Sequence, residues 1–208
     1  MNFHRPSNTK WPYDAHMARI VIVVGYARQS TYCEFLGEAY RRGAMTAGHS
    51  VSIYVLSKLT FDPILHHGFS KDQPLEPDIK DAQAAIGAAD HLVIIFPLWF
   101  GTLPAILKGF IERILQPGFA IQTNSSFRGY KPLLKGKSPR AIVTMGIPGW
   151  LYKWLFGSHA IRMLRRNILK FVGISPVRTQ ILGGVEAVSE VDRAQWVREV
   201  EAFCAAAR

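Results

Sequence analysis

Short apolar runs alternate with amphipathic segments along the whole chain. Residues 20–25 and 92–96 are continuous apolar runs rich in β-branched side chains, which is typical of parallel strands buried on both faces. Residues 140–145 and 177–182 predict two more strands of the same sheet. Residues 51–56 alternate apolar and polar side chains, so they predict a strand near the edge of that sheet.

Helical periodicity fills the spaces between these strands and follows the last one. The predicted helices run over residues 30–48, 78–89, 103–115, 150–171 and 190–207, with Gly157 as a candidate break in the fourth. Because strands and helices alternate throughout, we expect an α/β fold in which helices cover both faces of a parallel sheet. The expected strand order for five such strands is 2-1-3-4-5.

Length and composition fit one globular domain. The chain has 208 residues, of which 49% are hydrophobic and 19% charged, so a single α/β domain over residues 19–208 is expected. Residues 1–18 form a polar extension without the apolar core of a secretory signal. No apolar run reaches the roughly 20 residues that span a bilayer.

Net charge and cysteine content restrict the binding partners and the kinds of site to be expected. The formal charge of +10 indicates anionic partners, such as nucleotide phosphates, anionic lipid or nucleic acid, without choosing among them. Cys33 and Cys204 lack any paired spacing, so we expect neither a disulfide scaffold nor a zinc site, and a reducing cytoplasm fits best. His66 and His67 have no carboxylate at a matching spacing, and we place no metal there.

Two loops at strand ends carry the candidate chemistry. Trp99 and Phe100 stand in a loop between prolines, where fixed planar side chains favour a planar ligand. Ser30 and Thr31 are good N-cap residue types, and hydroxyls and backbone N–H groups at a helix start form an anion site. A capped helix with nothing bound explains the second pattern equally well.

The expected topology brings these loops together. With the order 2-1-3-4-5, the sheet changes direction between its first and third strands, and ligands bind there at the carboxyl ends. Residues 26–31 and 97–102 would then face one crevice, with residues 144–149 beside them, which predicts a mononucleotide-type site. The GxGxxG and GxxxxGK[ST] motifs are absent, and no Ser/His/Asp set declares itself, so a classical NAD fold, a P-loop ATPase and a hydrolase lose support.

Five segments along the chain form a recognisable set of motifs: FDPIL at 61–65, LEPDI at 75–79, AADHLVIIFPLWFGTLPAILKGFIERIL at 88–115, GFA at 118–120 and TMGIPGWLY at 144–152. Together they resemble the NAD(P)H:quinone oxidoreductase family, which has a flavodoxin-like fold. The PLxxxxxPAxLKG core is the most specific of these signals. The resemblance implies a flavodoxin-like three-layer sandwich and a tightly bound flavin that passes two electrons from NAD(P)H to a quinone-like acceptor.

The resemblance also implies a set of site residues. Ser30 and Thr31 would hold the flavin phosphate, and Tyr152 and His159 would stabilise negative charge on the flavin as catalytic residues. FAD is expected, with FMN as the alternative, and the acceptor pocket differs from that of relatives because Ile121 and Thr123 replace a tyrosine pair. The full set of expected cofactor-binding residues is Tyr26, Arg28, Ser30, Thr31, Pro97, Leu98, Trp99, Phe100, Thr144, Met145, Gly146, Ile147 and Tyr152.

Other interpretations stay open at this point. Residues 150–170 interleave aromatic and aliphatic residues with Lys and Arg. We expect this helix to pack on the sheet or on a second subunit of a homodimer, with docking on an anionic membrane as a further hypothesis. A non-catalytic flavoprotein that docks on an ion-transport system is the main alternative function. Nucleic-acid binding is not expected, because no recognised module accompanies the charge.

Overall fold

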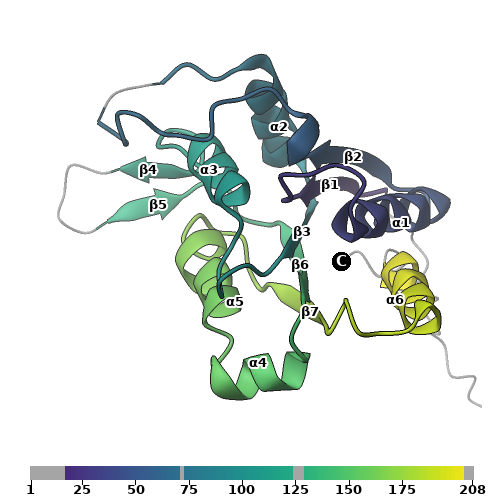
Figure 1. The fold of residues 1–208 in the computed structure, drawn as a ribbon. Coiled ribbons are helices and arrows are strands. Elements are labelled where there is room, and N and C mark those ends of the chain that lie inside the picture. The colour runs from purple at the N-terminus through teal and green to yellow at the C-terminus, as the bar shows by residue number, and fades with distance from the viewer. Residues whose placement is uncertain (1–16, 71–72, 124–128, 204–208) are drawn as a thin grey trace, which may run out of the picture.

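The computed structural model describes residues 17–70, 73–123 and 129–203. Its main sheet has five parallel strands in the order β2-β1-β3-β6-β7, which confirms the predicted order (Figure 1). The strands are β1 (Arg19–Val24), β2 (Ser50–Val55), β3 (His91–Pro97), β6 (Ser138–Met145) and β7 (Arg178–Gly183). The predicted edge strand, β2, lies at one edge of the sheet.

Helices cover both faces of the sheet, as a doubly wound fold requires. One face carries α1 (Tyr32–Thr46) and α6 (Glu190–Ala202); the other carries α2 (Pro77–Ala88), α3 (Ala105–Ile114), α5 (His159–Met163) and the π-helical turn η2 (Leu164–Leu169) (Figure 1). A short helix, α4 (Gly149–Leu155), follows β6, and a 3-10 turn, η1 (Leu56–Lys58), follows β2. The three-layer sandwich is therefore confirmed.

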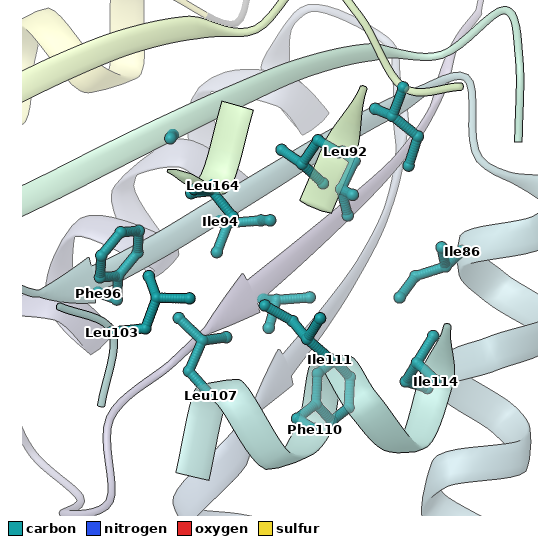
Figure 2. Packing of buried hydrophobic residues seen from close by; sticks show 14 of the residues in the cluster. Ile86, Leu92, Ile94, Phe96, Leu103, Leu107, Phe110, Ile111, Ile114 and Leu164 are labelled. Atoms are coloured by element: carbon teal, nitrogen blue, oxygen red, sulfur yellow. The ribbon is translucent and has the colours of Figure 1, made fainter. Parts of the chain in front are cut away.

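Alternating strand side chains build two separate cores. In β3, Ile94 and Phe96 pack with Leu107 and Ile111 of α3, and Figure 2 shows these side chains pointing toward one another. The intervening Ile95 packs on the opposite face with α1 and α6. This period of two explains why the strand is apolar at every position.

The segment after α3 differs from the prediction. No strand was predicted between residues 115 and 140, but β4 (Ile121–Thr123) and β5 (Tyr130–Pro132) form a small antiparallel pair outside the main sheet. Each strand has only three residues, too few for a readable alternation of apolar and polar positions. Two predicted segments lie outside the described residues: residues 1–16 of the polar extension and residues 204–207 of the closing helix.

The long basic segment breaks where expected. Gly157 and Ser158 have φ values of +54° and +53°, a left-handed conformation that ends α4 before α5 begins. Ile161 and Leu164 are buried on the sheet, which agrees with the packing that was predicted for this part of the segment. Across the described ranges, no helix combines the length and apolar character that crossing a bilayer requires.

We expect His91 to make stability depend on pH. His91 is buried at the start of β3 between the Tyr40 hydroxyl, 2.9 Å from Nε2, and the Ser138 hydroxyl, 2.6 Å from Nδ1. Burial, followed by the charges of Arg140 and Arg178, lowers its pKa to about 4. In the unfolded chain His91 is therefore protonated below about pH 6.5, whereas in the folded chain it stays neutral down to about pH 4.

The contribution of His91 to the free energy of unfolding should be fully present above about pH 6.5 and should fall by up to about 3 kcal/mol as the pH approaches 4. Urea unfolding of the wild type and of His91→Gln at both ends of this window measures the effect. The difference between the two proteins isolates His91 from the titrating carboxylates. An equal pH dependence in both proteins would contradict the assignment.

Candidate functional site

Three loops meet at the carboxyl edge of the sheet. Residues 25–31 follow β1, residues 98–104 follow β3 and residues 146–148 follow β6. These strands are neighbours, and the chain reverses its direction across the sheet between β1 and β3. Parallel sheets bind ligands at such a switch point, outside the carboxyl ends of their strands.

Direct contacts tie the loops together. The Tyr26 and Trp99 rings meet edge to face, with centroids 5.0 Å apart, so the first loop touches the second. The backbone N–H of Leu98 donates to the Thr144 carbonyl over 2.7 Å, which fixes the second loop on β6. The Thr144 hydroxyl in turn lies 3.3 Å from the Cys33 sulfur on α1.

The second loop contains a strained, exposed aromatic residue. Trp99 and Thr102 exchange two backbone hydrogen bonds, of 3.1 and 2.9 Å, around a two-residue turn. Phe100 and Gly101 both have positive φ, of +47° and +73°, as a type I′ turn demands. Asn or Gly suits such a position, whereas a fully exposed phenylalanine gains nothing there for folding.

We therefore expect Phe100→Asn to raise the free energy of unfolding by about 1 kcal/mol, because it relieves the left-handed strain. Urea unfolding of the protein without added ligand measures this. Phe69→Asn, at another exposed phenylalanine without positive φ, is the matched control and should change stability little. A less stable Phe100→Asn protein would show that the aromatic ring serves the fold.

The start of α1 already holds an anionic group. Thr31 caps the helix by accepting the Glu34 N–H over 3.3 Å, and the Glu34 carboxylate accepts the Ser30 N–H over 2.8 Å. Lys58 from η1 forms an ion pair with the same carboxylate, and together these contacts lower its pKa. The Ser30 N–H is therefore occupied by a carboxylate in this structure, and an external anion would have to compete with Glu34 for it.

The third loop leaves room for a flat ligand. A Cβ added at Gly146 would meet no atom within 4 Å, and Ile147 beside it is exposed. Together with the exposed rings of Trp99 and Phe100, this gives an apolar rim around open backbone. A planar ring with an anionic tail, as in a flavin nucleotide, fits these residues: the ring beside the rim and the tail toward Ser30.

His159 and Tyr152 lie at different depths. A Cβ on Gly101 would lie 3.2 Å from His159 Nε2, so this imidazole stands against the Phe100 turn. Its Nδ1 lies 2.9 Å from the Phe156 carbonyl, which can only accept, so Nδ1 carries a proton and Nε2 is the free atom. Tyr152 is fully buried, 6.4 Å from the His159 ring, and its hydroxyl has no hydrogen-bond partner in the described part of the chain.

Burial raises the pKa of Tyr152, against the lowering effect of the Ala160 and Ile161 backbone N–H groups and of Arg162. Its hydroxyl is thus neutral and shielded from solvent in this structure. The start of α5 therefore lies against the Tyr152 hydroxyl.

The structure brings most of the expected site residues to one place. Arg28 lies at the outer rim, with its guanidinium 6.0 Å from the Tyr26 ring. Pro97, Thr144 and Met145 are buried at the strand ends, so only their backbone is available to a ligand at these loops. Sequence reasoning missed Glu34, although Thr31-x-x-Glu34 is a capping-box spacing that marks it. Lys58 carried no such local signal, because it reaches the site from η1, 24 residues after its partner.

Comparison with known proteins agrees with this geometry. Guinea pig (Cavia porcellus) NAD(P)H dehydrogenase [quinone] 1 is 28% identical over 195 residues, which cover 82% of this chain and 70% of that protein. The NAD(P)H:quinone oxidoreductase of Methanothermobacter marburgensis shares the fold, with a TM-score of 0.78, 22% identity and coverage of 91% and 98% of the two chains. An FMN-dependent NADH-azoreductase from Bacillus anthracis, solved in complex with FMN, aligns with a TM-score of 0.72 at 17% identity, over 92% of this chain and all of that one.

A family profile described as a flavodoxin-like fold matches residues 18–204. This span includes all five parallel strands and the three loops of the crevice. The chain therefore belongs to the flavodoxin-like fold family, as the resemblance of its motifs to the NAD(P)H:quinone oxidoreductases of that fold implied.

Proposed function

We propose that this protein is a flavin-dependent NAD(P)H oxidoreductase that passes two electrons to a quinone-like acceptor. The observation that carries the proposal is the meeting of three loops at the switch point, where the exposed Trp99 and Phe100 rings lie close to the start of α1, whose Ser30 N–H donates to a carboxylate. The curated relative is named for NAD(P)H and quinone, and a fold neighbour is named for FMN. These names support an oxidoreductase rather than a non-catalytic flavoprotein.

The residues around the crevice have distinct roles in this proposal. Trp99 and Phe100 flank the flavin ring on one side, and Gly146 lets backbone approach it on the other. Ser30 and Thr31 receive the phosphate at the start of α1. When bound, the flavin supplies the two-electron chemistry, accepting hydride from NAD(P)H and reducing the acceptor.

The protein's own groups orient the reactants and manage charge. His159 holds a proton on Nδ1 against the Phe156 carbonyl, so Nε2 can take up a second proton and become a donor toward developing negative charge. Tyr152, on the neighbouring α4, keeps a neutral hydroxyl that can donate a hydrogen bond toward the same developing charge. Phe100 and Trp99 exclude water from the ring.

The finer assignments belong to the same proposal. FAD is the expected flavin and FMN the alternative, NADH or NADPH is the donor, and a homodimer in the cytoplasm is the expected form. Arg28, at the outer rim, is placed to meet a phosphate of the nucleotide.

An anaerobic redox cycle tests the proposed function. The purified chain is loaded with FAD or FMN, mixed with NADPH and then with menadione, while its visible spectrum is recorded. Bleaching by NADPH followed by recolouring with menadione is the expected result. A protein that binds flavin but is bleached by neither NADPH nor, in a second run, NADH would be the non-catalytic flavoprotein, and a protein that binds neither flavin would end the proposal.

Replacing Glu34 by glutamine should strengthen flavin binding by about tenfold, or about 1.4 kcal/mol. The carboxylate competes with the flavin phosphate for the Ser30 N–H and also repels it, whereas glutamine keeps the shape and frees Lys58 for the phosphate. Flavin fluorescence titration measures the dissociation constant without turnover. Glu38→Gln, on the same helix but paired with Arg41, is the matched control and should leave the constant unchanged.

A further inference from the structure

Basic charge is concentrated in one segment of the chain. Residues 114–185 contain 11 Lys and Arg and no Asp or Glu, whereas the other 136 residues contain 14 Lys and Arg and 15 Asp and Glu. The whole positive charge of the protein therefore comes from the segment that runs from the end of α3 to the loop after β7. Charge that is segregated in this way indicates a partner rather than general solubility.

Four of these cations line one groove. A groove of about 470 Å³ is lined by Arg162 of α5, Arg165 and Arg166 of η2, and Lys170 directly after η2, together with Ser175, Pro176 and Val177. All four cations are exposed, and within the described ranges none forms an ion pair. Like charges held together without counterions attract an anionic surface or ligand.

An exposed aromatic face adjoins the groove. Trp150 and Trp154 on α4 are 69% and 78% exposed, and Leu155 is 59% exposed. Trp150, Lys153 and Trp154 follow a spacing of three and four, so they share the outer face of the helix while Tyr152 faces inward. Helix α4 lies at the lower end of the fold in Figure 1, apart from the other helices.

The two features form one continuous surface. A Cβ added at Gly157 would lie 3.0 Å from the Arg162 guanidinium, so the first cation of the groove reaches the connection that ends α4. Tryptophan is enriched at the headgroup level of bilayers, and clustered Lys and Arg bind anionic lipid phosphates. The surface combines both requirements of an interfacial anchor.

We propose that α4 and the basic groove dock this protein on an anionic lipid membrane. Trp150, Trp154 and Leu155 enter the headgroup region, and Arg162, Arg165, Arg166 and Lys170 bind lipid phosphates. A second copy of the chain is a poorer occupant, because a two-fold symmetric contact through this surface would set the same four cations against themselves. The inference does not depend on flavin binding, and its test uses no enzyme turnover.

Flotation with vesicles tests the proposal on the full chain. At low ionic strength the protein should float with vesicles of phosphatidylcholine and phosphatidylglycerol in equal parts, and should stay behind with phosphatidylcholine alone. Binding should weaken in steps as salt is added. Failure to bind the anionic vesicles, or equal binding to both, would overturn the proposal.

Variants locate the docking surface. Arg165→Gln with Arg166→Gln should weaken partitioning about 30-fold, which corresponds to about 1 kcal/mol for each cation. Lys80→Gln with Arg198→Gln removes two exposed cations elsewhere and should have little effect. Trp154→Ala should weaken partitioning about tenfold, whereas Phe69→Ala, at a distant exposed ring, should not. Partitioning that is unchanged in the paired arginine variant would overturn the assignment.

Two further outcomes would reassign the surface. If Trp154→Ala converts a dimer into a monomer in sedimentation velocity runs, the aromatic face is an interface between copies of this chain and the membrane proposal fails. If a short DNA duplex binds as tightly as the anionic vesicles and displaces them, the basic groove is a nucleic-acid site and the proposal fails equally.

Discussion

Replacing Gly183 by alanine is expected to lower the free energy of unfolding by about 3 kcal/mol and to abolish flavin binding. A Cβ at this position would lie 2.3 Å from the Gly149 nitrogen and 2.8 Å from the Ile147 carbonyl oxygen. Both are backbone atoms, so no side-chain rotation relieves the contact. Urea unfolding and flavin fluorescence titration measure the two losses.

Two backbone hydrogen bonds connect the chain after β7 to the loop after β6, so a change at Gly183 also affects flavin binding. Gly184 N–H donates to the Ile147 carbonyl over 3.0 Å, and Val185 N–H donates to the Met145 carbonyl over 3.1 Å. The end of β7 thus fixes the loop after β6, and a methyl group on Gly183 would push that loop away from the crevice.

Gly146→Ala in the same loop is the matched control for stability. A Cβ there meets no atom within 4 Å, so the variant should unfold like the wild type. It should nevertheless bind flavin at least tenfold more weakly, because the methyl group fills the space that the ring needs. A Gly183→Ala protein as stable as the wild type would contradict the close packing of β7 on this loop.

Replacing Arg113 by alanine is expected to cost about 3–5 kcal/mol of stability. Arg113 is fully buried on α3, where its guanidinium donates to the Pro74 carbonyl over 2.7 Å and pairs with the Glu76 carboxylate over 2.5 Å. Its removal leaves a cavity and a partly buried carboxylate without its cation. Urea unfolding at pH 7 measures the loss.

The same pair should contribute to stability above acidic pH. Burial raises the pKa of Glu76, but hydrogen bonds from the backbone N–H of Asp62 and from Arg113 outweigh it, so the net pKa is below its usual value. A carboxylate with a lowered folded pKa contributes stability above its unfolded pKa and loses it as the pH falls through the folded value. The acid-dependent loss should therefore shrink in Glu76→Gln.

Lys108→Ala provides the control for Arg113. Lys108 lies on the same helix and pairs with Glu112, but these side chains are 45% and 40% exposed, so this pair should contribute less than about 1 kcal/mol. A loss at Arg113 no larger than at Lys108 would mean that the buried guanidinium is dispensable for folding.

The sequence predicts the sheet because its strands are unusually uniform. β1 and β3 are apolar at nearly every position, as is typical of strands covered on both faces. Such a run can be recognised from neighbouring residues alone, without knowledge of distant contacts. The β4–β5 pair could not be predicted in the same way, since each of its strands has only three residues.

The candidate site divides similarly between local and distant signals. Trp99, Phe100 and Thr31 can be identified from the sequence by their residue type and their position after predicted strands. The sheet topology then brings their loops together. The burial of Tyr152 and the ion pair between Lys58 and Glu34 depend on how helices and turns pack in the folded protein. No pattern of neighbouring residues encodes them.

The most direct test is an equilibrium titration of FAD and FMN into the ligand-free protein, followed by flavin fluorescence. We predict saturable quenching by at least one flavin, with a dissociation constant that increases at least tenfold in Gly146→Ala and decreases in Glu34→Gln, while Glu38→Gln matches the wild type. Absence of quenching with both flavins, or equal affinity in all four proteins, would contradict the assignment of a flavin to this crevice.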